Sequence, residues 1–347
     1  MTIAILAYYR EFLDECVASV LAQSYKDFKV VVYDDCSPED LRSVLYTFND
    51  PRLSYVRNER NLGTFANANL ALDLCDTEYI NVFHADDKMF PWMVGKLCKV
   101  LNDNPTAGIA ASSRMCGMGS SQVSLSKLFW GGTLFSRDEL IKATNKKRRN
   151  LIVCPSLTFR KKIIDDAGIR FRPDVGPAAD MMLSFEANHN GIEIYGVRMP
   201  LLETRFHDKN WTSLAGVENW NRSLKKVDDY LTDSRLNFDI NGIREYMAKM
   251  DILTLSSGMS TEEDFALLIS RRKYLEEEKG WRIRDSVFND AVSIGYLNKY
   301  IASARSSGAS MEQCRKKLSM LRERGVRASF TRKLKWFINH RVWVGFD

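Results

Sequence analysis

The sequence lacks the features that mark several large classes of protein. No stretch approaches the roughly 18 consecutive apolar residues that cross a bilayer, and the first nine residues carry no basic side chain of a signal peptide. The seven cysteines are odd in number and form no C-x-x-C pair, which argues against a disulfide framework and a zinc site. The absence of a G-x-x-x-x-G-K-[ST] motif argues against a nucleoside triphosphate hydrolase. We therefore expect a protein of the cytoplasm with reduced thiols.

Net positive charge is confined to the C-terminal tail. Residues 305–341 contain eleven Lys or Arg and two Glu, which gives this tail a net charge of +9. Since the whole chain carries +6, the remainder is at −3. A protein that binds nucleic acid would distribute basic residues among aromatic ones over a binding face. The composition therefore argues against nucleic acid as a partner.

The first hundred residues alternate strand and helix patterns. Apolar runs predict strands at 3–7, 28–33, 53–56 and 78–83, and helical periodicity predicts helices at 12–21 and 63–75. Ser37, Pro38 and Glu39 predict the start of another helix, because proline and acidic residues favour its first turn. This alternation is typical of βαβ units and an α/β fold with a mostly parallel sheet.

The pattern becomes less regular beyond this point. Short strands and loops follow, and after about residue 213 the sequence is helical and polar. We predict a first domain at 1–215, composed of halves at 1–110 and 111–215, and a helical C-terminal region at 216–347.

Acidic and metal-competent residues occur where predicted strands end. Asp34 and Asp35 follow one strand, Asp86 and Asp87 follow another, and His207 lies further along the chain. The carboxyl ends of parallel strands meet at one edge of a sheet, and carboxylates are the ligands that Mg²⁺ and Mn²⁺ prefer. The alternative is that each acidic pair caps a turn or a helix. We interpret His84, beside the second pair, as a packing residue or a support for metal ligands.

Five segments in order resemble a family 2 glycosyltransferase of the GT-A fold. They are Ile5–Glu11, Ser19–Ser24, Val31–Ser37, Asn58–Gly63 and Asp86–Asp87. The resemblance covers residues 2–110 and, more loosely, 150–213. It implies a GT-A type nucleotide-binding sandwich with a mostly parallel central sheet.

The resemblance also implies where a nucleotide would lie. The residues expected beside it are at strand ends or in the following loops: Ala7, Tyr8, Tyr9, Asp34, Asp35, Asn61, Gly63 and Asp86. Asp35 would accept a hydrogen bond from a uracil ring, with Asp34 beside it, and Asp86 would lie on the ribose side. Tyr9 and Cys36 replace an asparagine and a glycine that are common in the family.

The remaining roles concern metal and catalysis. The resemblance implies that Asp87 and His207 bind Mn²⁺ or Mg²⁺ and that Asp180 is the catalytic base of an inverting transfer. Asp180 is also a candidate N-cap for the helix predicted at 181–188, and the two roles are compatible.

The implied function is transfer of a sugar from a nucleotide-sugar, a UDP-sugar in our prediction, to a glycan or lipid-linked glycan in bacterial surface polysaccharide synthesis, such as lipopolysaccharide or capsule. The apolar spacing in the basic tail suits a helix on the anionic inner face of the plasma membrane or, alternatively, a packed terminal helix. A nucleotidyltransferase is an alternative, although its usual glycine-rich loop after the first strand is missing. An inactive scaffold subunit with the same fold is another.

Overall fold

The computed structural model describes residues 1–118, 123–125, 132–147, 151–206, 216–233, 241, 245, 248, 252, 262–278, 280, 283–285 and 288. The chain divides into two compact units, Met1–Ile240 and Asn241–Asp347. The first unit contains every site residue predicted from the sequence. The sequence prediction assigned helix α9, Gly216–Asp233, to the C-terminal region, yet α9 packs against α7, Ala179–His189, of the first unit.

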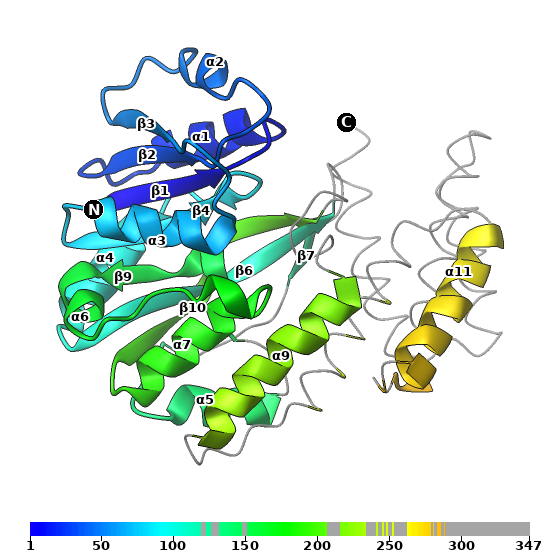
Figure 1. The fold of residues 1–347 in the computed structure, drawn as a ribbon. Coiled ribbons are helices and arrows are strands. Elements are labelled where there is room, and N and C mark those ends of the chain that lie inside the picture. The colour runs from blue at the N-terminus through cyan, green and yellow to red at the C-terminus, as the bar shows by residue number, and fades with distance from the viewer. Residues whose placement is uncertain are drawn as a thin grey trace, which may run out of the picture. The chain divides into compact units, whose positions relative to one another are not determined.

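A ten-stranded sheet forms the centre of the first unit, in the order β3-β2-β1-β4-β9-β6-β10-β5, with β7 paired to β6 and β8 to β10 (Figure 1). The strands are β1 Thr2–Ala7, β2 Lys29–Asp34, β3 Leu53–Arg57, β4 Tyr79–His84, β5 Lys88–Met89, β6 Ala107–Met118, β7 Val123–Leu125, β8 Thr133–Phe135, β9 Thr158–Arg160 and β10 Glu193–Phe206. Strands β3, β2, β1 and β4 pair in parallel, as the sequence predicts. Beyond them the sheet is mixed, because β9 runs antiparallel to both β4 and β6.

Helices cover both faces of this sheet. They are α1 Leu13–Leu21, α2 Arg42–Leu45, α3 Thr64–Leu74, α4 Met93–Asp103, α5 Glu139–Lys147 and α6 Lys161–Asp166, followed by α7 and α9. Apolar residues of α1, α2 and α4 pack with alternate residues of β1 and β2 in one core cluster. Helix α3 packs against β1 and β4, and α7 against β10.

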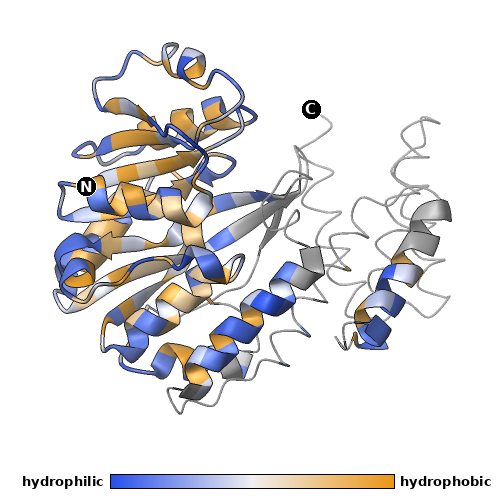
Figure 2. Cartoon of the chain, in the orientation of Figure 1, coloured by the Kyte–Doolittle hydropathy of each residue, from blue (hydrophilic) through white to orange (hydrophobic). Residues whose placement is uncertain are grey.

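The burial of β1 explains its sequence. All six of its residues are buried, and Figure 2 shows the central strands as mainly apolar. A parallel strand covered on both faces requires a continuous apolar run, in contrast to the alternation of a half-exposed strand. Because the strand itself is apolar, polar residues occur in the loops that follow the strand ends.

One element differs from its prediction. The helix expected to start at Ser37 begins instead at Arg42. The Asp34 Oδ1 atom accepts a hydrogen bond from Ser37 N at 2.7 Å, and Ser37 Oγ accepts one from Glu39 N at 3.0 Å. These bonds hold the segment in a turn, the alternative that short polar side chains offer to the backbone.

Most of the described residues of the second unit are helical. Helix α11, Glu262–Lys273, continues into the π-helical segment η4, Tyr274–Glu278. Arg272 forms two salt bridges here, from Nε to Glu276 Oε2 at 3.1 Å and from Nη2 to Asp285 Oδ1 at 2.6 Å. Within the described residues of the whole chain, no helix has the length and apolarity needed to cross a membrane. The predicted basic tail, 305–341, lies outside the described residues.

Candidate active site

The ends of three parallel strands bring the two acidic pairs together. In the sheet register, Ala7 at the end of β1 lies beside Asp34 of β2, and Leu6 lies beside His84 of β4. Two further backbone hydrogen bonds extend this pairing, from Asp35 N to Ala7 O at 2.9 Å and from Ala85 N to Leu6 O at 3.1 Å. The acidic pairs therefore flank the carboxyl end of β1, as the sequence predicts for a ligand site of an α/β sheet.

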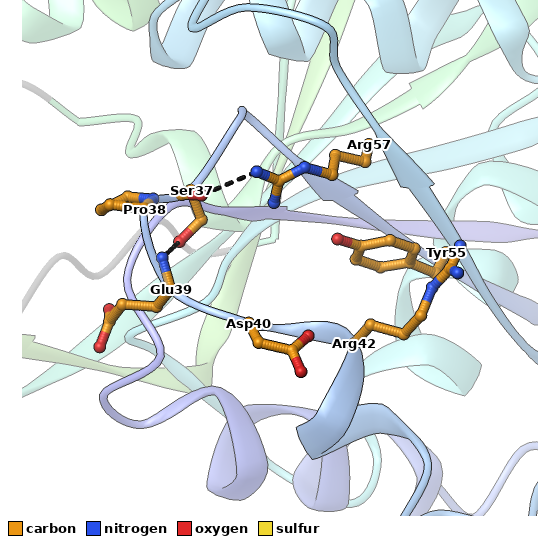
Figure 3. Close-up of a pocket in the computed structure, with 7 residues that line it drawn as sticks. All are labelled: Ser37, Pro38, Glu39, Asp40, Arg42, Tyr55 and Arg57. Carbon is orange, nitrogen blue, oxygen red and sulfur yellow. Dashed lines mark hydrogen bonds between the residues drawn. The ribbon is translucent and has the colours of Figure 1, made fainter.

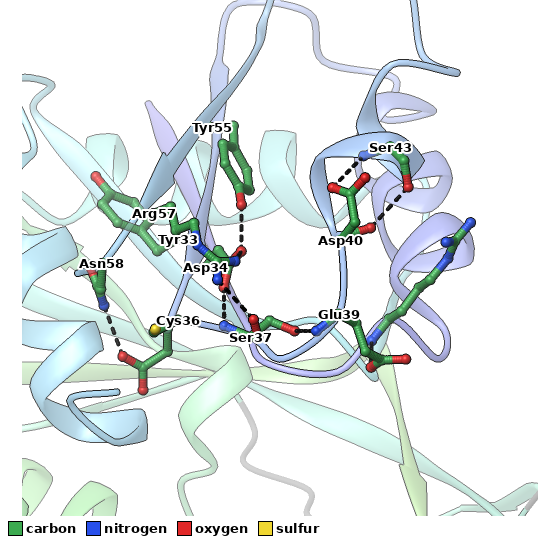
Figure 4. Close-up of polar contacts among 12 residues, drawn as sticks. Tyr33, Asp34, Cys36, Ser37, Glu39, Asp40, Ser43, Tyr55, Arg57 and Asn58 are labelled. Atoms are coloured by element: carbon green, nitrogen blue, oxygen red, sulfur yellow. Dashed lines mark hydrogen bonds and ion pairs between the residues drawn. The ribbon is translucent and has the colours of Figure 1, made fainter. Parts of the chain in front are cut away.

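The side chain of Asp34 points into the protein interior. Its carboxylate is fully buried and accepts hydrogen bonds from Ser37 N at 2.7 Å, from Arg57 Nη1 at 2.6 Å and from the Tyr55 hydroxyl (Figure 4). A buried charge with several charge-assisted donors is a stable arrangement. Asp34 thus joins the ends of β2 and β3, and its expected position beside a nucleotide stays a prediction.

Asp35 organises the loop that precedes α3. Its Oδ1 accepts from Asn58 Nδ2 at 2.9 Å and from Leu62 N at 2.8 Å, and its Oδ2 accepts from Gly63 N at 2.8 Å. A carboxylate oxygen can accept two hydrogen bonds. Among the described residues, the Oδ2 atom accepts only from Gly63, so it has capacity for a ligand donor.

Two open hollows adjoin these loops. One is lined by Asn58, Glu59, Arg60 and Leu62, next to the Asp35 contacts. The other is lined by Arg42, Tyr55, Arg57 and the segment 37–40, as Figure 3 shows.

The other expected nucleotide residues stand at the same edge of the sheet. The rings of Tyr8 and Tyr9 follow β1 and meet edge-to-face, with centroids 4.9 Å apart. Exposed Asn61 accepts from Gly63 N at 2.9 Å through its side-chain oxygen. Gly63 has φ +83° and ψ 155°, a backbone conformation essentially confined to glycine.

A cluster of possible metal ligands follows β4. One ligand atom each from His84, Asp86 and Asp87 lies within 4.8 Å of the others. The His84 Nε2 atom is buried and has no hydrogen-bond partner among the described residues. Burial lowers the pKa of the His84 ring, which favours the neutral form that binds metals. Two carboxylates and an orphaned imidazole nitrogen are a donor set that fits a divalent metal such as Mn²⁺.

Asp87 is the more deeply buried member of its pair. Its side chain is 3% exposed, whereas Asp86 is half-buried. Burial and the neighbouring Asp86 carboxylate raise the pKa of Asp87 well above its usual range, despite the Arg205 N–H that donates to Oδ1 at 3.1 Å. A cation at this position would offset both effects.

Asp180 lies in the first turn of α7. The helix begins at Ala179, so Asp180 is not its N-cap, and its carboxylate accepts from Met181 N at 2.7 Å and from Cys154 N at 3.2 Å. Burial raises the pKa of Asp180 to about 6, although these N–H groups and Arg114 oppose the rise. A carboxylate with such a pKa is suited to accept a proton near neutral pH.

Asp180 and the metal-ligand cluster share their surroundings. Burial, followed by the charges of Asp180 and Asp87, raises the pKa of the Cys154 thiol well above its usual range. The positive charge of Arg114 acts against the rise in the pKa of both carboxyl groups. Cys154 and Arg114 therefore interact electrostatically with both Asp87 and Asp180.

Two residues near Asp180 and the metal-ligand cluster were not predicted from the sequence. Arg114 lies within β6 and Cys154 begins the short helix η2, Cys154–Ser156, and no local pattern marks either residue. His84 had a local signal, because only Ala85 separates it from the acidic pair in Phe83-His-Ala-Asp-Asp87. The expected metal ligand His207 lies outside the described residues.

Residues 2–167 match the family described as "Glycosyl transferase family 2". The chain is 38% identical over 77 residues to the putative colanic acid biosynthesis glycosyl transferase WcaA of Escherichia coli K12, a match that covers 22% of this chain and 28% of WcaA. It is 25% identical over 232 residues to the putative teichuronic acid biosynthesis glycosyltransferase TuaG of Bacillus subtilis 168, covering 66% of this chain and 86% of TuaG.

The fold also resembles a solved structure. The crystal structure of residues 1–349 of S. aureus TarS in complex with UDP-GlcNAc matches with a TM-score of 0.55 and 15% identity. The match covers 89% of this chain and 92% of that one. At this identity the likeness concerns the fold alone.

Proposed function

Because the chain belongs to the family 2 glycosyltransferases through residues 2–167, we propose that it transfers a sugar from a UDP-sugar to a glycan or lipid-linked glycan acceptor, with inversion at the anomeric carbon. One observation carries the proposal. Asp180, a carboxylate whose pKa is raised to about 6, shares the surroundings of Cys154 and Arg114 with Asp87 of the metal-ligand cluster. A base and a possible phosphate-binding metal site therefore occur together.

Asp180 would act as the general base. Its carboxylate takes the proton of the acceptor hydroxyl while that oxygen forms a bond to the anomeric carbon from the face opposite the leaving group. The bond from the anomeric carbon to the phosphate oxygen breaks, and its electron pair leaves with the diphosphate. The N–H groups of Met181 and Cys154 hold the carboxylate in one orientation throughout.

Asp87 and His207 would hold the metal, with Asp86 beside them on the ribose side. A divalent ion bound there supplies neutralisation of charge on the diphosphate leaving group. The buried Asp87 and the adjacent Asp86 support this assignment, since two neighbouring carboxylates without a cation repel each other.

The nucleoside would bind at the end of β1. Asp35 offers its Oδ2 atom to the uracil N–H, and Ala7, Tyr8, Tyr9, Asn61 and Gly63 border the same edge. The UDP-GlcNAc bound by TarS is in keeping with a UDP-linked donor for this fold.

The acceptor would be a bacterial surface polysaccharide precursor. The names of WcaA and TuaG refer to colanic acid and teichuronic acid biosynthesis, which are syntheses of this kind. We place the protein in the cytoplasm, with its basic tail on the inner face of the plasma membrane. The catalytic domain in this proposal is residues 1–215, and residues 216–347 are the helical C-terminal region.

A panel of nucleotide-sugars tests the proposal. Each is added to the full-length protein with Mn²⁺ or Mg²⁺, and the melting temperature and the release of free nucleotide are measured. A UDP-sugar with metal should raise the melting temperature through preferential binding to the folded state, and slow hydrolysis of that donor should release UDP. Stabilisation without donor turnover or transfer to any glycan would favour a binding or scaffold subunit, and the absence of any stabilisation would overturn the proposal.

A further inference from the structure

The strongest observation outside the expected ligand set concerns His84. It is the last residue of β4, fixed by the pairing of that strand with β1, in which Leu6 lies beside His84. It directly precedes the loop that carries Asp86 and Asp87, so its position relative to them is set by only two intervening backbone units. Its main-chain oxygen is also within 3.5 Å of the Cys16 thiol of α1.

The ring of His84 lies near the carboxylates. One of its nitrogens lies within 4.8 Å of an oxygen of each of the two aspartates. Ligands at about 2.1 Å from a metal are separated by about 3.0 Å when adjacent and about 4.2 Å when opposite each other. Since their separation does not exceed 4.8 Å, the His84 nitrogen and the Asp87 oxygen need to approach by at most about 1.8 Å to take adjacent positions on one ion.

The second observation is independent of the acidic pair. The Nε2 atom of His84 is enclosed and has no hydrogen-bond partner within the described parts of the chain. Buried polar atoms in folded proteins nearly always have a partner, and exceptions often mark an ion or water that belongs at the site. A buried imidazole ring with an unpartnered nitrogen, close to two carboxylates, would gain a partner from a bound cation.

We propose that His84 is a further direct ligand of the divalent metal, in addition to Asp87 and His207, and that it strengthens the preference of the site for Mn²⁺ over Mg²⁺. This inference rests on the proposed function, because it concerns the metal of the same site. Imidazole nitrogen suits the first-row transition metals, whereas Mg²⁺ takes oxygen ligands almost exclusively. The identity of residue 84 thus contributes to the metal preference, together with the imidazole proposed at His207.

Pulsed electron paramagnetic resonance on Mn²⁺ bound to the protein with UDP provides a direct test, because it detects nitrogen coordinated to the ion. The variant His207→Asn removes the other expected imidazole. A nitrogen coupling that persists in His207→Asn identifies His84 as a ligand. Loss of all nitrogen coupling in this variant would overturn the proposal, and the test requires no change at residue 84.

A second measurement compares metal affinities by calorimetry in the presence of UDP. In His84→Asn, the affinity for Mn²⁺ should fall by at least about tenfold, with a change of less than about threefold for Mg²⁺. His84→Asp should shift the preference further towards Mg²⁺. Equal losses for both metals, or none, would contradict a selective ligand.

The matched control is His189→Asn. His189 lies at the end of α7, with its Nδ1 atom 3.0 Å from Asp138 Oδ1, and is not a member of the cluster of His84, Asp86 and Asp87. Its substitution should leave both metal affinities unchanged. If the wild-type protein binds neither metal, the proposed function fails as well. If it binds both and the His84 variants keep its preference, only the role of His84 is refuted.

Discussion

The backbone N–H of Arg205 donates a hydrogen bond to Asp87 Oδ1 at 3.1 Å, across 118 positions of sequence. The side chain of Arg205 donates a hydrogen bond from Nη2 to Glu15 Oε2 at 2.6 Å. Its guanidinium carbon lies 4.6 Å from the centre of the Phe12 ring. The end of β10 is thereby fixed between the acidic pair and α1. Arg205 is two residues before His207, so the chain reaches the acidic pair shortly before the second expected metal ligand.

Asp87→Asn should abolish stabilisation by metal and UDP. The amide lacks the charge that attracts the ion, so we expect the apparent affinity for Mn²⁺ with UDP to fall by at least about tenfold. The metal-free variant should melt no lower than the wild type, because it no longer buries a carboxylate beside Asp86. Thermal melting with and without Mn²⁺ and UDP measures both effects. Asp103→Asn, an exposed carboxylate paired with Lys99, should behave as wild type.

Asp180→Asn should separate binding from chemistry. Loss of a general base lowers kcat by about 10² to 10⁴, while UDP affinity should change by less than about twofold because Asp180 is assigned to the acceptor side. Steady-state kinetics and calorimetry on the same preparation make the comparison. Asp166→Asn, on the exposed end of α6, is the control and should retain full activity. A parallel loss of UDP binding in Asp180→Asn would contradict the assignment.

The pH dependence of turnover should follow the ionisation of the Asp180 carboxyl group. Since its pKa is raised to about 6, the carboxyl group is protonated and inactive below that pH and ionised above it. Turnover at saturating substrate should therefore rise about tenfold per unit up to about pH 6 and then level off. The residual activity of Asp180→Asn should lack this rise. A rise that remains in the variant would assign the titration to another group.

Gly63→Ala should weaken both the fold and nucleotide binding. Its positive φ of 83° with ψ of 155° is unfavourable for alanine, at a cost on the order of 1–3 kcal/mol. No atom within 4 Å would clash with a Cβ, so strain alone is responsible. Because Gly63 N holds Asp35, we also expect UDP affinity to fall by about tenfold, a difference of about 1.4 kcal/mol. Gly168→Ala has the same kind of strain, at φ +66°, and should lose stability without losing UDP affinity.

The basic tail should govern binding to anionic vesicles. The charge reversals Lys333→Glu and Lys335→Glu together should reduce flotation of the full-length protein with anionic liposomes by at least about tenfold, since each basic residue near such a surface contributes about 1 kcal/mol. The matched control reverses Lys99 and Lys162, two exposed lysines of α4 and α6. Equal flotation of the two double variants would indicate that the tail does not contact the membrane.

Local pattern was sufficient for the nucleotide half of the fold. The strands that start near Ile3, Phe28 and Leu53 were predicted within one or two residues, because apolar runs of that length cannot remain exposed. The turn at Ser37 was not predicted, since its hydrogen bond to Asp34 competes with a helix start that has the same local sequence. The mixed pairing of β9 was also beyond reach, because nothing in a three-residue strand specifies its direction.

The sequence by itself determined the α/β class, the acidic pairs after two strands and the resemblance that placed Asp180. These features depend on neighbours along the chain, where periodicity and motif order can be read directly. The tertiary structure alone decided which distant residues surround Asp34, Asp35 and Asp180. Asp34 is buried and bonded to Arg57, whereas Asp35 accepts a hydrogen bond from Gly63 N. Cys154 N donates to Asp180, and the charge of Arg114 acts on the same carboxylate. Burial and charge at these positions come from residues far apart in sequence, so only the folded chain defines them.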